Sequence, residues 1–380
     1  MGAEARTALF DLGAHNPSFD ALRRAAPAIR APIDFCVPVN RHFPPPELLE
    51  DIRAELPRLL RHYPDYADVH QRAVARIAGV PAENVVVANG STELITLLCE
   101  RCRGPIATPV PTFGRWTDLP IANGTPVSFL QRRPERGFAL GVDEIVEHVR
   151  RHGIRTIVLC NPNNPTGALL DAGDVRRLVD ALADLDLVIL DESFLDFAGI
   201  ESAAALAVER PNLVIVKSLG KSIGWHGVRL GYAVAREDRA GEMRARVPYW
   251  NVNGLAAFVL GRVAELVPEL AASFDRVRAD RDAMVRALHG VRNLRTFPSH
   301  ANYVCVELPR DVSGRALRDA LLDEHGLLVR ECGNKLGSSE RYLRLAVNLP
   351  PENARLVAAL ASLPEREPGP APVDAPTIRL

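Results

Sequence analysis

The sequence contains very little lysine: only Lys217, Lys221 and Lys335 occur among its 380 residues. It also lacks a strong net charge, since the formal value is −1, which gives no electrostatic attraction to nucleic acid or to an anionic membrane. No apolar run reaches the roughly 18 residues that a membrane-spanning helix requires. We therefore expect neither a nucleic-acid partner nor a membrane partner.

A dense cysteine framework and a secretory signal are also missing. The six cysteines are spread along the chain, which suits the reducing cytoplasm. Cys99 and Cys102 form one close pair without a second pair at zinc-site spacing, so we expect packing at a helix end rather than metal or redox use. The segment 1–10 carries Glu4 and has no apolar stretch of the signal-peptide kind. These features predict a cytoplasmic protein.

The position of Lys221 is the most informative feature that is present. It lies in Ser218-Leu219-Gly220-Lys221, a turn of small residues between two apolar runs. Arginine cannot give up its proton in a protein, so a neutral amine that condenses with an aldehyde must be a lysine. The sequence therefore predicts a Schiff base between Lys221 and pyridoxal phosphate (PLP). Lys217 is the nearby competitor but lacks the Gly…Arg sequence that follows Lys221, and we expect Lys335 to face solvent.

Apolar runs alternate with helical patterns between about residues 84 and 236. Continuous β-branched runs separated by helices predict a mostly parallel sheet covered by helices on both faces. The fold class is therefore α/β, with an N-terminal arm at 1–45 and a large PLP-binding domain at 46–250. Strands are expected at 84–87, 156–159, 187–190 and 213–216, and helices at 142–152 and 171–183.

After Pro248 the pattern changes. Residues 254–288 have the spacing of a long helix or a helix pair that leads out of the large domain. Strands expected at 301–306, 327–330 and 342–347 predict a smaller α+β domain within residues 251–364. Residues 365–380, with four prolines and few apolar residues, are predicted to form a disordered tail.

Polar residues follow the predicted strands, and in open α/β sheets ligands gather at the carboxyl ends of strands. Gly90, Ser91 and Thr92 follow the first strand and begin a helix, where free N–H groups and the helix dipole attract anions. Ser91 or Thr92 alone would also be an ordinary helix cap. Asn164 lies in the rigid loop 161–167 and can donate a hydrogen bond to a phenolate oxygen.

Two further strand ends complete the predicted site. Asp191 ends a buried strand and needs a partner, and a protonated pyridine nitrogen would be one. A helix cap is the alternative interpretation of Asp191. Ser218 and Arg229 flank Lys221 at distances suitable for a second grip on a phosphate, with Arg229 binding through two nitrogens.

Three of these segments together resemble the class I/II aminotransferases of PLP fold type I. They are Asn-Pro-Asn-Asn-Pro-Thr-Gly at 161–167, Asp-Glu-Ser-Phe at 191–194, and Ser-Leu-Gly-Lys with Gly-Val-Arg-Leu-Gly-Tyr at 218–232. Their order and spacing match, and the resemblance extends over residues 30–362. Within that superfamily the chain looks most like histidinol-phosphate aminotransferases and threonine-phosphate decarboxylases, through segments 62–65, 248–253, 329–332 and 342–344.

The resemblance implies a role for each matching position toward PLP. Lys221 would form the Schiff base and move a proton, Asp191 would pair with the pyridine nitrogen, and Asn164 would hold O3′. Phe113 would stack on the ring. The phosphate would be held by Gly90, Ser91, Thr92, Ser218 and Arg229.

The resemblance also implies how substrate and a second subunit are held. Arg344 would clamp the substrate α-carboxylate, Arg330 would hold a second anionic group, and Asn40 in the arm would face the substrate. Tyr63 would reach the coenzyme phosphate of a neighbouring subunit, so a homodimer is implied.

The sequence departs from the family pattern at one position beside the coenzyme and at others on the substrate side. Phe194 stands where many relatives have a tyrosine whose hydroxyl binds O3′. Arg41-His42-Phe43 replaces the usual Pro-Leu-Gly of the arm, and Trp225-His226 is bulky where relatives often have smaller residues. His226 is an acid–base candidate by residue type, although a histidine beside a glycine is more often a loop filler. These departures indicate a substrate other than histidinol phosphate or threonine phosphate.

The leading interpretation is a PLP-dependent aminotransferase acting on an amino acid or on an amine derived from one, with or without a phosphate group. The alternative is a PLP-dependent decarboxylase, or a lyase acting on a specialised metabolite. A non-catalytic protein of this fold is disfavoured because Lys221, Asp191, Asn164 and Arg229 are all present.

Overall fold

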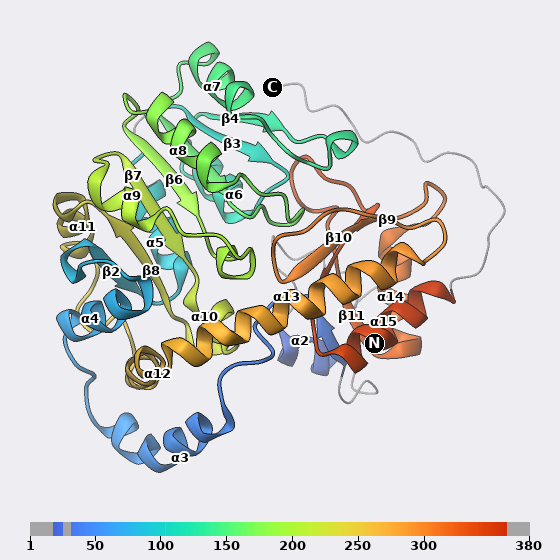
Figure 1. Cartoon of the computed structure of the whole chain (residues 1–380), viewed down its shortest axis with the longest axis horizontal. Coiled ribbons are helices and arrows are strands. Elements are labelled where there is room, and N and C mark those ends of the chain that lie inside the picture. The colour runs from blue at the N-terminus through green and yellow to red at the C-terminus, as the bar shows by residue number, and fades with distance from the viewer. Residues whose placement is uncertain (1–17, 26–31, 103, 363–380) are drawn as a thin grey trace.

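Seven strands form the larger of two sheets, in the spatial order β2-β8-β7-β6-β5-β3-β4 (Figure 1). Neighbouring strands from β7 to β4 run parallel, whereas β8 is antiparallel to both β7 and β2. The mostly parallel sheet expected from the sequence is therefore confirmed. The strands are β2 (Val85–Ala88), β3 (Ile106–Val110), β4 (Val127–Gln131), β5 (Thr156–Cys160), β6 (Leu187–Asp191), β7 (Leu213–Lys217) and β8 (Gly231–Ala235).

The computed structural model describes residues 18–25, 32–102 and 104–362. The expectations for the segment 1–10 and for a tail at 365–380 lie outside these residues. Across the described ranges, no helix is both long and apolar enough to cross a membrane.

Side chains along the central strands alternate between two apolar clusters, as the two-residue period of a strand requires. In β6, Val188 and Leu190 belong to the cluster on one face, and Leu187 and Ile189 to the cluster on the other. The first cluster is covered by α4, α7, α8, α9 and α12, and the second by α5, α6 and α11. By this alternation the side chain of Asp191, the last residue of β6, belongs to the α5–α6 face.

The helices around the large sheet follow the predicted pattern. The helices expected at 142–152 and 171–183 correspond to α7 and α8. The helices are α3 (Pro46–Arg61), α4 (Ala67–Ala78), α5 (Ser91–Cys99), α6 (Arg115–Ala122), α7 (Val142–Arg151), α8 (Ala172–Ala181), α9 (Ala204–Glu209), α10 (Leu219–Ser222), α11 (Glu237–Arg244) and α12 (Gly254–Glu265).

A second, five-stranded sheet has the order β1-β11-β12-β10-β9. Its first strand comes from the N-terminal arm, because β1 (Ile33–Phe35) pairs in parallel with β11 (Leu327–Glu331). The other strands are β9 (Arg295–Thr296), β10 (Tyr303–Glu307) and β12 (Tyr342–Ala346). The N-terminal arm thus contributes a strand to the smaller sheet. The domain boundaries expected from the sequence stay a prediction.

Helix α13 (Val267–His289) crosses from the larger sheet to the smaller one (Figure 1). It follows α12 directly, so the predicted helix pair is confirmed. Helices α14 (Gly314–His325) and α15 (Pro350–Ala361) pack with α13 around the smaller sheet, and α2 (Phe19–Ala25) lies near its arm strand.

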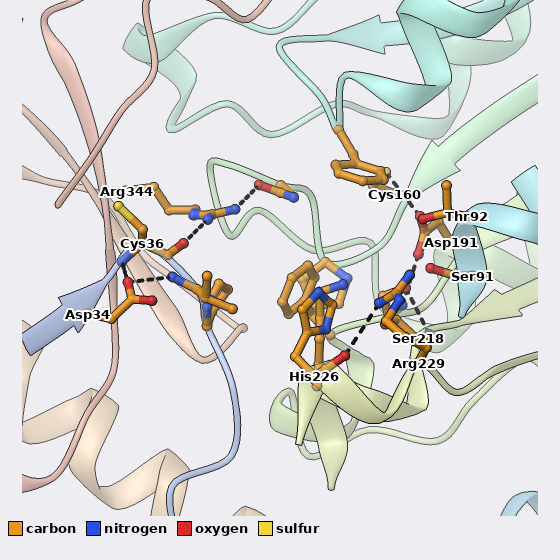
Figure 2. A pocket seen from close by; sticks show the side chains of 18 of the residues that line it. Asp34, Cys36, Ser91, Thr92, Cys160, Asp191, Ser218, His226, Arg229 and Arg344 are labelled. Atoms are coloured by element: carbon orange, nitrogen blue, oxygen red, sulfur yellow. Dashed lines mark hydrogen bonds between the residues drawn. The ribbon is translucent and has the colours of Figure 1, made fainter. Parts of the chain in front are cut away.

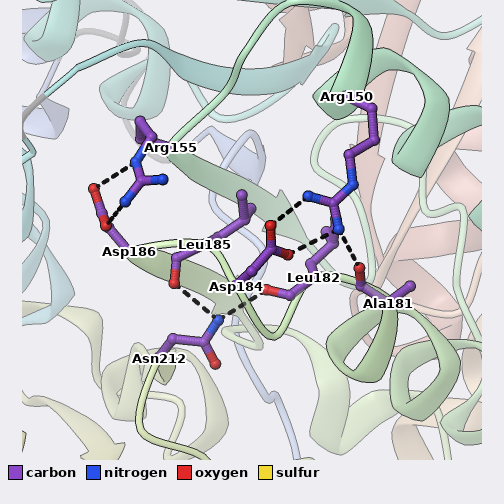
Figure 3. A network of polar contacts seen from close by, with 8 residues as sticks. All are labelled: Arg150, Arg155, Ala181, Leu182, Asp184, Leu185, Asp186 and Asn212. Carbon is purple, nitrogen blue, oxygen red and sulfur yellow. Dashed lines mark hydrogen bonds and ion pairs between the residues drawn. The ribbon is translucent and has the colours of Figure 1, made fainter.

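A polar network joins the amino ends of the large-sheet strands, at the edge away from the carboxyl ends (Figure 3). Asn212 is buried and donates to the carbonyls of Leu182 and Leu185 at 2.9 and 3.2 Å. Arg150 forms an ion pair with Asp184, with nitrogen–oxygen distances of 2.6 and 2.8 Å. Exposed ion pairs contribute little to stability. We therefore expect the buried hydrogen bonds of Asn212 to contribute more than the Arg150–Asp184 ion pair to holding the turn between α8 and β6.

Candidate active site

A cavity of about 370 Å³ lies at the carboxyl ends of the large-sheet strands and extends to Arg344 in the smaller sheet (Figure 2). Figure 2 shows Arg344 at one side, Asp191, Ser218 and Arg229 at the other, and His226 between them. Ten of the predicted site residues line it: Ser91, Thr92, Phe113, Asn164, Asp191, Phe194, Ser218, Lys221, Arg229 and Arg344.

Lys221 lies in the short helix α10, where its Nζ is 5.0 Å from the centroid of the Phe194 ring. Burial lowers the pKa of its amine to about 8; Asp191 opposes this shift, and Arg344 and Arg229 add to it. An amine with this pKa is partly neutral at physiological pH, which nucleophilic attack on an aldehyde requires.

Lys217 is buried in an ion pair with Asp196, which also accepts a hydrogen bond from Ser222 Oγ at 2.5 Å. Burial disfavours the charge of Lys217, but Asp196, Tyr232 and Glu192 outweigh that effect and raise its pKa. A permanently protonated amine is not a nucleophile, so Lys217 is unsuited to Schiff-base formation.

The phosphate-side residues converge where α5 begins. Gly90 has φ of +76°, and a methyl group added to it would lie 2.5 Å from Nη2 of Arg229. Arg229 itself has φ of +64°, a left-handed conformation that is uncommon for a residue with a side chain. Ser91, Thr92 and Ser218 line the same end of the cavity (Figure 2). Free N–H groups, hydroxyls and a guanidinium together form a cradle for a phosphate.

Asp191 is 5% exposed and is fixed through both carboxylate oxygens. Its Oδ1 accepts from the backbone N–H of Ser193 at 3.1 Å, and its Oδ2 accepts from the indole Nε1 of Trp116 at 2.8 Å. Cys160 Sγ lies 4.0 Å from Oδ2, and burial together with the Asp191 charge raises the pKa of that thiol to about 12. The groups that donate to the carboxylate are therefore neutral.

Asn164 and Arg344 are joined by a hydrogen bond of 2.8 Å from Nη1 of Arg344 to Oδ1 of Asn164. This contact orients the amide, because its oxygen faces Arg344 and its NH₂ group is left to donate elsewhere. Nη2 of Arg344 donates to the carbonyl of Cys36 in the arm, which fixes the guanidinium at the wall of the cavity.

The expectation that Lys335 faces solvent is wrong. Lys335 is 7% exposed; its Nζ donates to the carbonyl of Thr112 at 3.3 Å and lies 5.9 Å from the centroid of the Phe113 ring. Burial, followed by Arg330 and Arg344, lowers the pKa of its amine to about 7. The loop after β11 carries Lys335 across to the large sheet, a contact that no local sequence pattern indicates.

Four predicted residues do not line the cavity: Gly90, Asn40, Arg330 and Tyr63. Gly90 lies against Arg229 as described. The buried amide of Asn40 donates to the carbonyl of Ser222 and to Ser273 Oγ, at 2.9 and 2.7 Å. Asn40 therefore connects the N-terminal arm to the turn that carries Lys221 and to α13. Its NH₂ group is used in these contacts and does not line the cavity.

Arg330 is buried on β11 and donates from Nη2 to Asn334 Oδ1 at 2.6 Å. It is the register partner of Arg344 across the antiparallel pair β11–β12. Tyr63 is 80% exposed and stacks on Trp250, with ring centroids 4.5 Å apart.

Phe194 and His226 also line the cavity. The Phe194 ring packs edge-on against Tyr303 with centroids 4.9 Å apart. Because the residue is phenylalanine, it offers no hydroxyl that could donate to O3′ together with Asn164. His226 begins the turn that ends at Arg229, and its ring lies beside Gly220, next to Lys221.

The sequence model of the family described as aminotransferase class I and II matches residues 30–360. The chain belongs to the class I and II aminotransferase family. PLP is its coenzyme, and the cavity fits that group: Lys221 is a buried amine of lowered pKa, the Asp191 carboxylate is fixed by hydrogen bonds to both oxygens, and a side chain at position 90 would collide with the guanidinium of Arg229.

Curated relatives of several activities resemble this chain. It is 29% identical over 368 residues to an L-serine phosphate decarboxylase of Sulfurospirillum multivorans, covering 92% of this chain and 93% of the relative. It is 34% identical over 334 residues to a CMP-5'-(3-aminopropyl)phosphonate synthase of Streptomyces rubellomurinus, and this match spans 87% of the chain but only 52% of that relative's length. A histidinol-phosphate aminotransferase of Gloeobacter violaceus is 34% identical over 77% of this chain and 79% of the relative.

A solved structure of a decarboxylase from Sulfurospirillum multivorans has the same fold. The TM-score is 0.86 at 29% identity, with 94% of this chain and 96% of that chain covered. The match supports the family relationship and the PLP fold type I architecture over almost the whole chain.

Proposed function

We propose that this chain is a PLP-dependent decarboxylase that acts on a small α-amino acid carrying a phosphate or phosphonate group on its side chain. The reaction type rests on the L-serine phosphate decarboxylase relative and on the solved decarboxylase structure, each of which matches nearly the whole chain. The substrate class rests on one feature of the molecule, the group of three cations Arg330, Lys335 and Arg344.

Arg330 and Arg344 lie directly opposite each other on neighbouring strands, and both lower the pKa of the Lys335 amine. Like charges in such positions repel, and all three residues are at most 8% exposed, so water screens them poorly. An α-carboxylate supplies one negative charge. A phosphate or phosphonate group on the substrate would add a second anion near these basic side chains and weaken their mutual repulsion.

When bound, PLP draws electrons from the bonds at the substrate Cα. Decarboxylation breaks the bond between Cα and the carboxylate carbon, releases CO₂ and leaves Cα to receive one proton. Lys221 lies in the same cavity with an amine pKa of about 8, so it can hold that proton near neutral pH. His226 is a second candidate donor because its side chain lines the cavity.

Transamination is the second candidate function. The family match and the histidinol-phosphate aminotransferase relative support it. It would use the same residues, with Lys221 moving the proton away from Cα rather than to it. The two reactions differ in their products, so the choice is made by product analysis.

A homodimer is part of the proposal. Tyr63, Tyr66, Tyr249 and Trp250 form an aromatic surface in which three of the four rings are more than 60% exposed. Large exposed aromatic groups on one face favour a protein partner. Tyr63 lies outside the cavity of its own subunit, which agrees with a role in the cavity of a second copy.

The test is incubation of the purified holoenzyme with O-phospho-L-serine, with 2-amino-4-phosphonobutyrate and with unmodified L-serine, without any keto acid. We expect equal amounts of CO₂ and amine from a phosphorylated or phosphonate substrate and none from serine. Keto acid formation that consumes the coenzyme's aldehyde form once per subunit would instead establish transamination. Release of pyruvate, ammonia and phosphate would establish the lyase alternative.

A further inference from the structure

We infer that Trp116 is a positioning residue for Asp191: its indole N–H holds the carboxylate in the orientation in which it receives the PLP ring nitrogen. The inference concerns binding of the coenzyme and does not depend on which reaction follows. It begins from the 2.8 Å hydrogen bond between Nε1 of Trp116 and Oδ2 of Asp191.

Trp116 is held in place by its surroundings. It is 0% exposed and belongs to the apolar cluster that also contains Leu94 and Ile95 of α5 and Ile189 of β6. Helix α5 begins at the phosphate cradle, and β6 ends at Asp191. The same packed cluster therefore connects the phosphate end, the indole and the strand that carries the carboxylate.

The backbone around Trp116 links it to the ring-stacking residue. At the start of α6, the backbone N–H of Trp116 donates to the carbonyl of Phe113 at 2.9 Å. One helical turn thus carries Phe113, which lines the cavity, and Trp116, which contacts Asp191. The face of the coenzyme ring and the partner of its nitrogen are positioned by the same segment.

The choice of tryptophan has a chemical consequence. An indole N–H only donates and does not titrate in the physiological range, whereas a histidine there would add a charge below its pKa. The indole therefore donates to the Asp191 carboxylate without changing its own charge over the working pH range. Trp116 and, at 4.0 Å, the Cys160 thiol donate to Oδ2, whereas Oδ1 accepts from the backbone N–H of Ser193, so Oδ1 has a second acceptor position for the ring N–H.

The test compares Trp116→Phe with Met243→Ala. Met243 is buried in the same apolar cluster but lies on α11, so its truncation removes packing and leaves the Asp191 hydrogen bonds intact. Two quantities are measured on each protein: the Kd for PLP by equilibrium dialysis of the apoenzyme, and the ¹⁵N chemical shift of the ring nitrogen of bound, labelled PLP between pH 6 and 9.

We expect Trp116→Phe to weaken PLP binding roughly 10- to 100-fold, the effect of losing one hydrogen bond to a buried charge. We expect its ¹⁵N shift to move toward the unprotonated value as pH rises, while wild type and Met243→Ala keep the protonated value. If Trp116→Phe matches wild type in both quantities, or if Met243→Ala changes them equally, Trp116 is only a core residue.

A second replacement removes the risk that Trp116→Phe does not fold. Benzothienylalanine at position 116 has nearly the shape of tryptophan but carries sulfur in place of the N–H. The same loss of affinity and the same ¹⁵N titration are expected for it. Wild-type behaviour of this isosteric variant would overturn the inference, because the shape is kept and only the donor is gone.

Discussion

The amine of Lys335 lies over the ring of Phe113, with Nζ 5.9 Å from the ring centroid. The two residues come from different sheets: Lys335 follows β11 of the smaller sheet, and Phe113 follows β3 of the larger one. Nζ also donates to the carbonyl of Thr112, at the neighbouring position. This contact places a third basic side chain, beside Arg330 and Arg344, against Phe113, a residue that lines the coenzyme cavity.

If Lys335 binds the second anion of the substrate, Lys335→Met raises KM for the phosphorylated substrate. Loss of one charge-assisted hydrogen bond predicts roughly 10- to 100-fold at pH 7, with kcat changed much less. Methionine keeps the length of the apolar stem, so the contact with Phe113 is preserved. Steady-state kinetics on the same substrate provide the measurement, and an unchanged KM would contradict the assignment.

The pH dependence of the wild type provides a second test of Lys335. Its pKa of about 7 means that the free enzyme loses this charge as pH rises through 7. Anion binding requires the protonated amine, so KM should rise between pH 7 and 9, by at most about tenfold per pH unit. Lys335→Met should show a higher KM without this slope. A slope that persists in the variant would point to a different titrating group.

Gly90 gives a prediction about coenzyme binding. Gly90→Ala places a methyl group 2.5 Å from Nη2 of Arg229 in a backbone conformation with φ of +76°. We expect the guanidinium to be displaced and PLP affinity to fall by at least about tenfold, the effect of losing a contact to phosphate.

Gly79→Ala is the matched control for Gly90→Ala. Gly79 ends α4 with φ of +67°, and a methyl group there would meet nothing within 4 Å. This variant should lose about 1 to 2 kcal/mol of unfolding free energy from backbone strain and keep wild-type PLP affinity. If Gly90→Ala bound PLP as tightly as Gly79→Ala, the contact between position 90 and Arg229 would have no role in coenzyme binding.

The strand ends could be predicted from sequence because the signal is local. Runs such as 187–190 are continuous and β-branched, and Asp191 follows directly, so both the strand and its polar end are visible in five residues. The strand β3 was missed because Pro109 interrupts its pattern, and β1 because it has only three residues. Short or interrupted strands are fixed by their neighbours and not by their own residues.

Trp116 and Lys335 could not be assigned from sequence for a different reason. Trp116 contacts Asp191 from 75 positions away, and Lys335 contacts Thr112 from 223 positions away. Neither residue type marks its partner, since a tryptophan in a helix usually packs in a core and a lysine in a loop usually meets water. The Trp116 contact arises where α6 packs on the larger sheet, and the Lys335 contact arises where the loop after β11 reaches the larger sheet.

The absence of a hydroxyl at Phe194 leads to a prediction about the protonation of the bound coenzyme. Phe194→Tyr adds a hydroxyl beside Lys221, whose Nζ lies 5.0 Å from the ring centroid. If that hydroxyl donates to O3′ together with Asn164, it stabilises the deprotonated form of the bound coenzyme. The pH midpoint of the coenzyme's absorbance change should then fall relative to wild type, as followed by spectrophotometric titration. Identical titrations of the two proteins would refute the idea.

Tyr63 allows the homodimer to be tested through the site itself. Tyr63→Phe keeps the stacking on Trp250 but removes the hydroxyl, and should weaken PLP binding in a pure preparation. Lys221→Ala removes the attachment point and should abolish the covalently bound coenzyme, as judged by borohydride trapping. Each variant alone is therefore defective.

Mixing the two variants under conditions of subunit exchange separates the possibilities. A mixed dimer has one site that combines Lys221 of one subunit with Tyr63 of the other, so about a quarter of all sites should regain tight PLP binding. Its second site combines both defects and stays empty. If Tyr63 acted within its own subunit, no mixed site would be intact and mixing would restore nothing. Recovery after mixing therefore requires that Tyr63 crosses the interface, which a concentration-dependent molar mass alone would not establish.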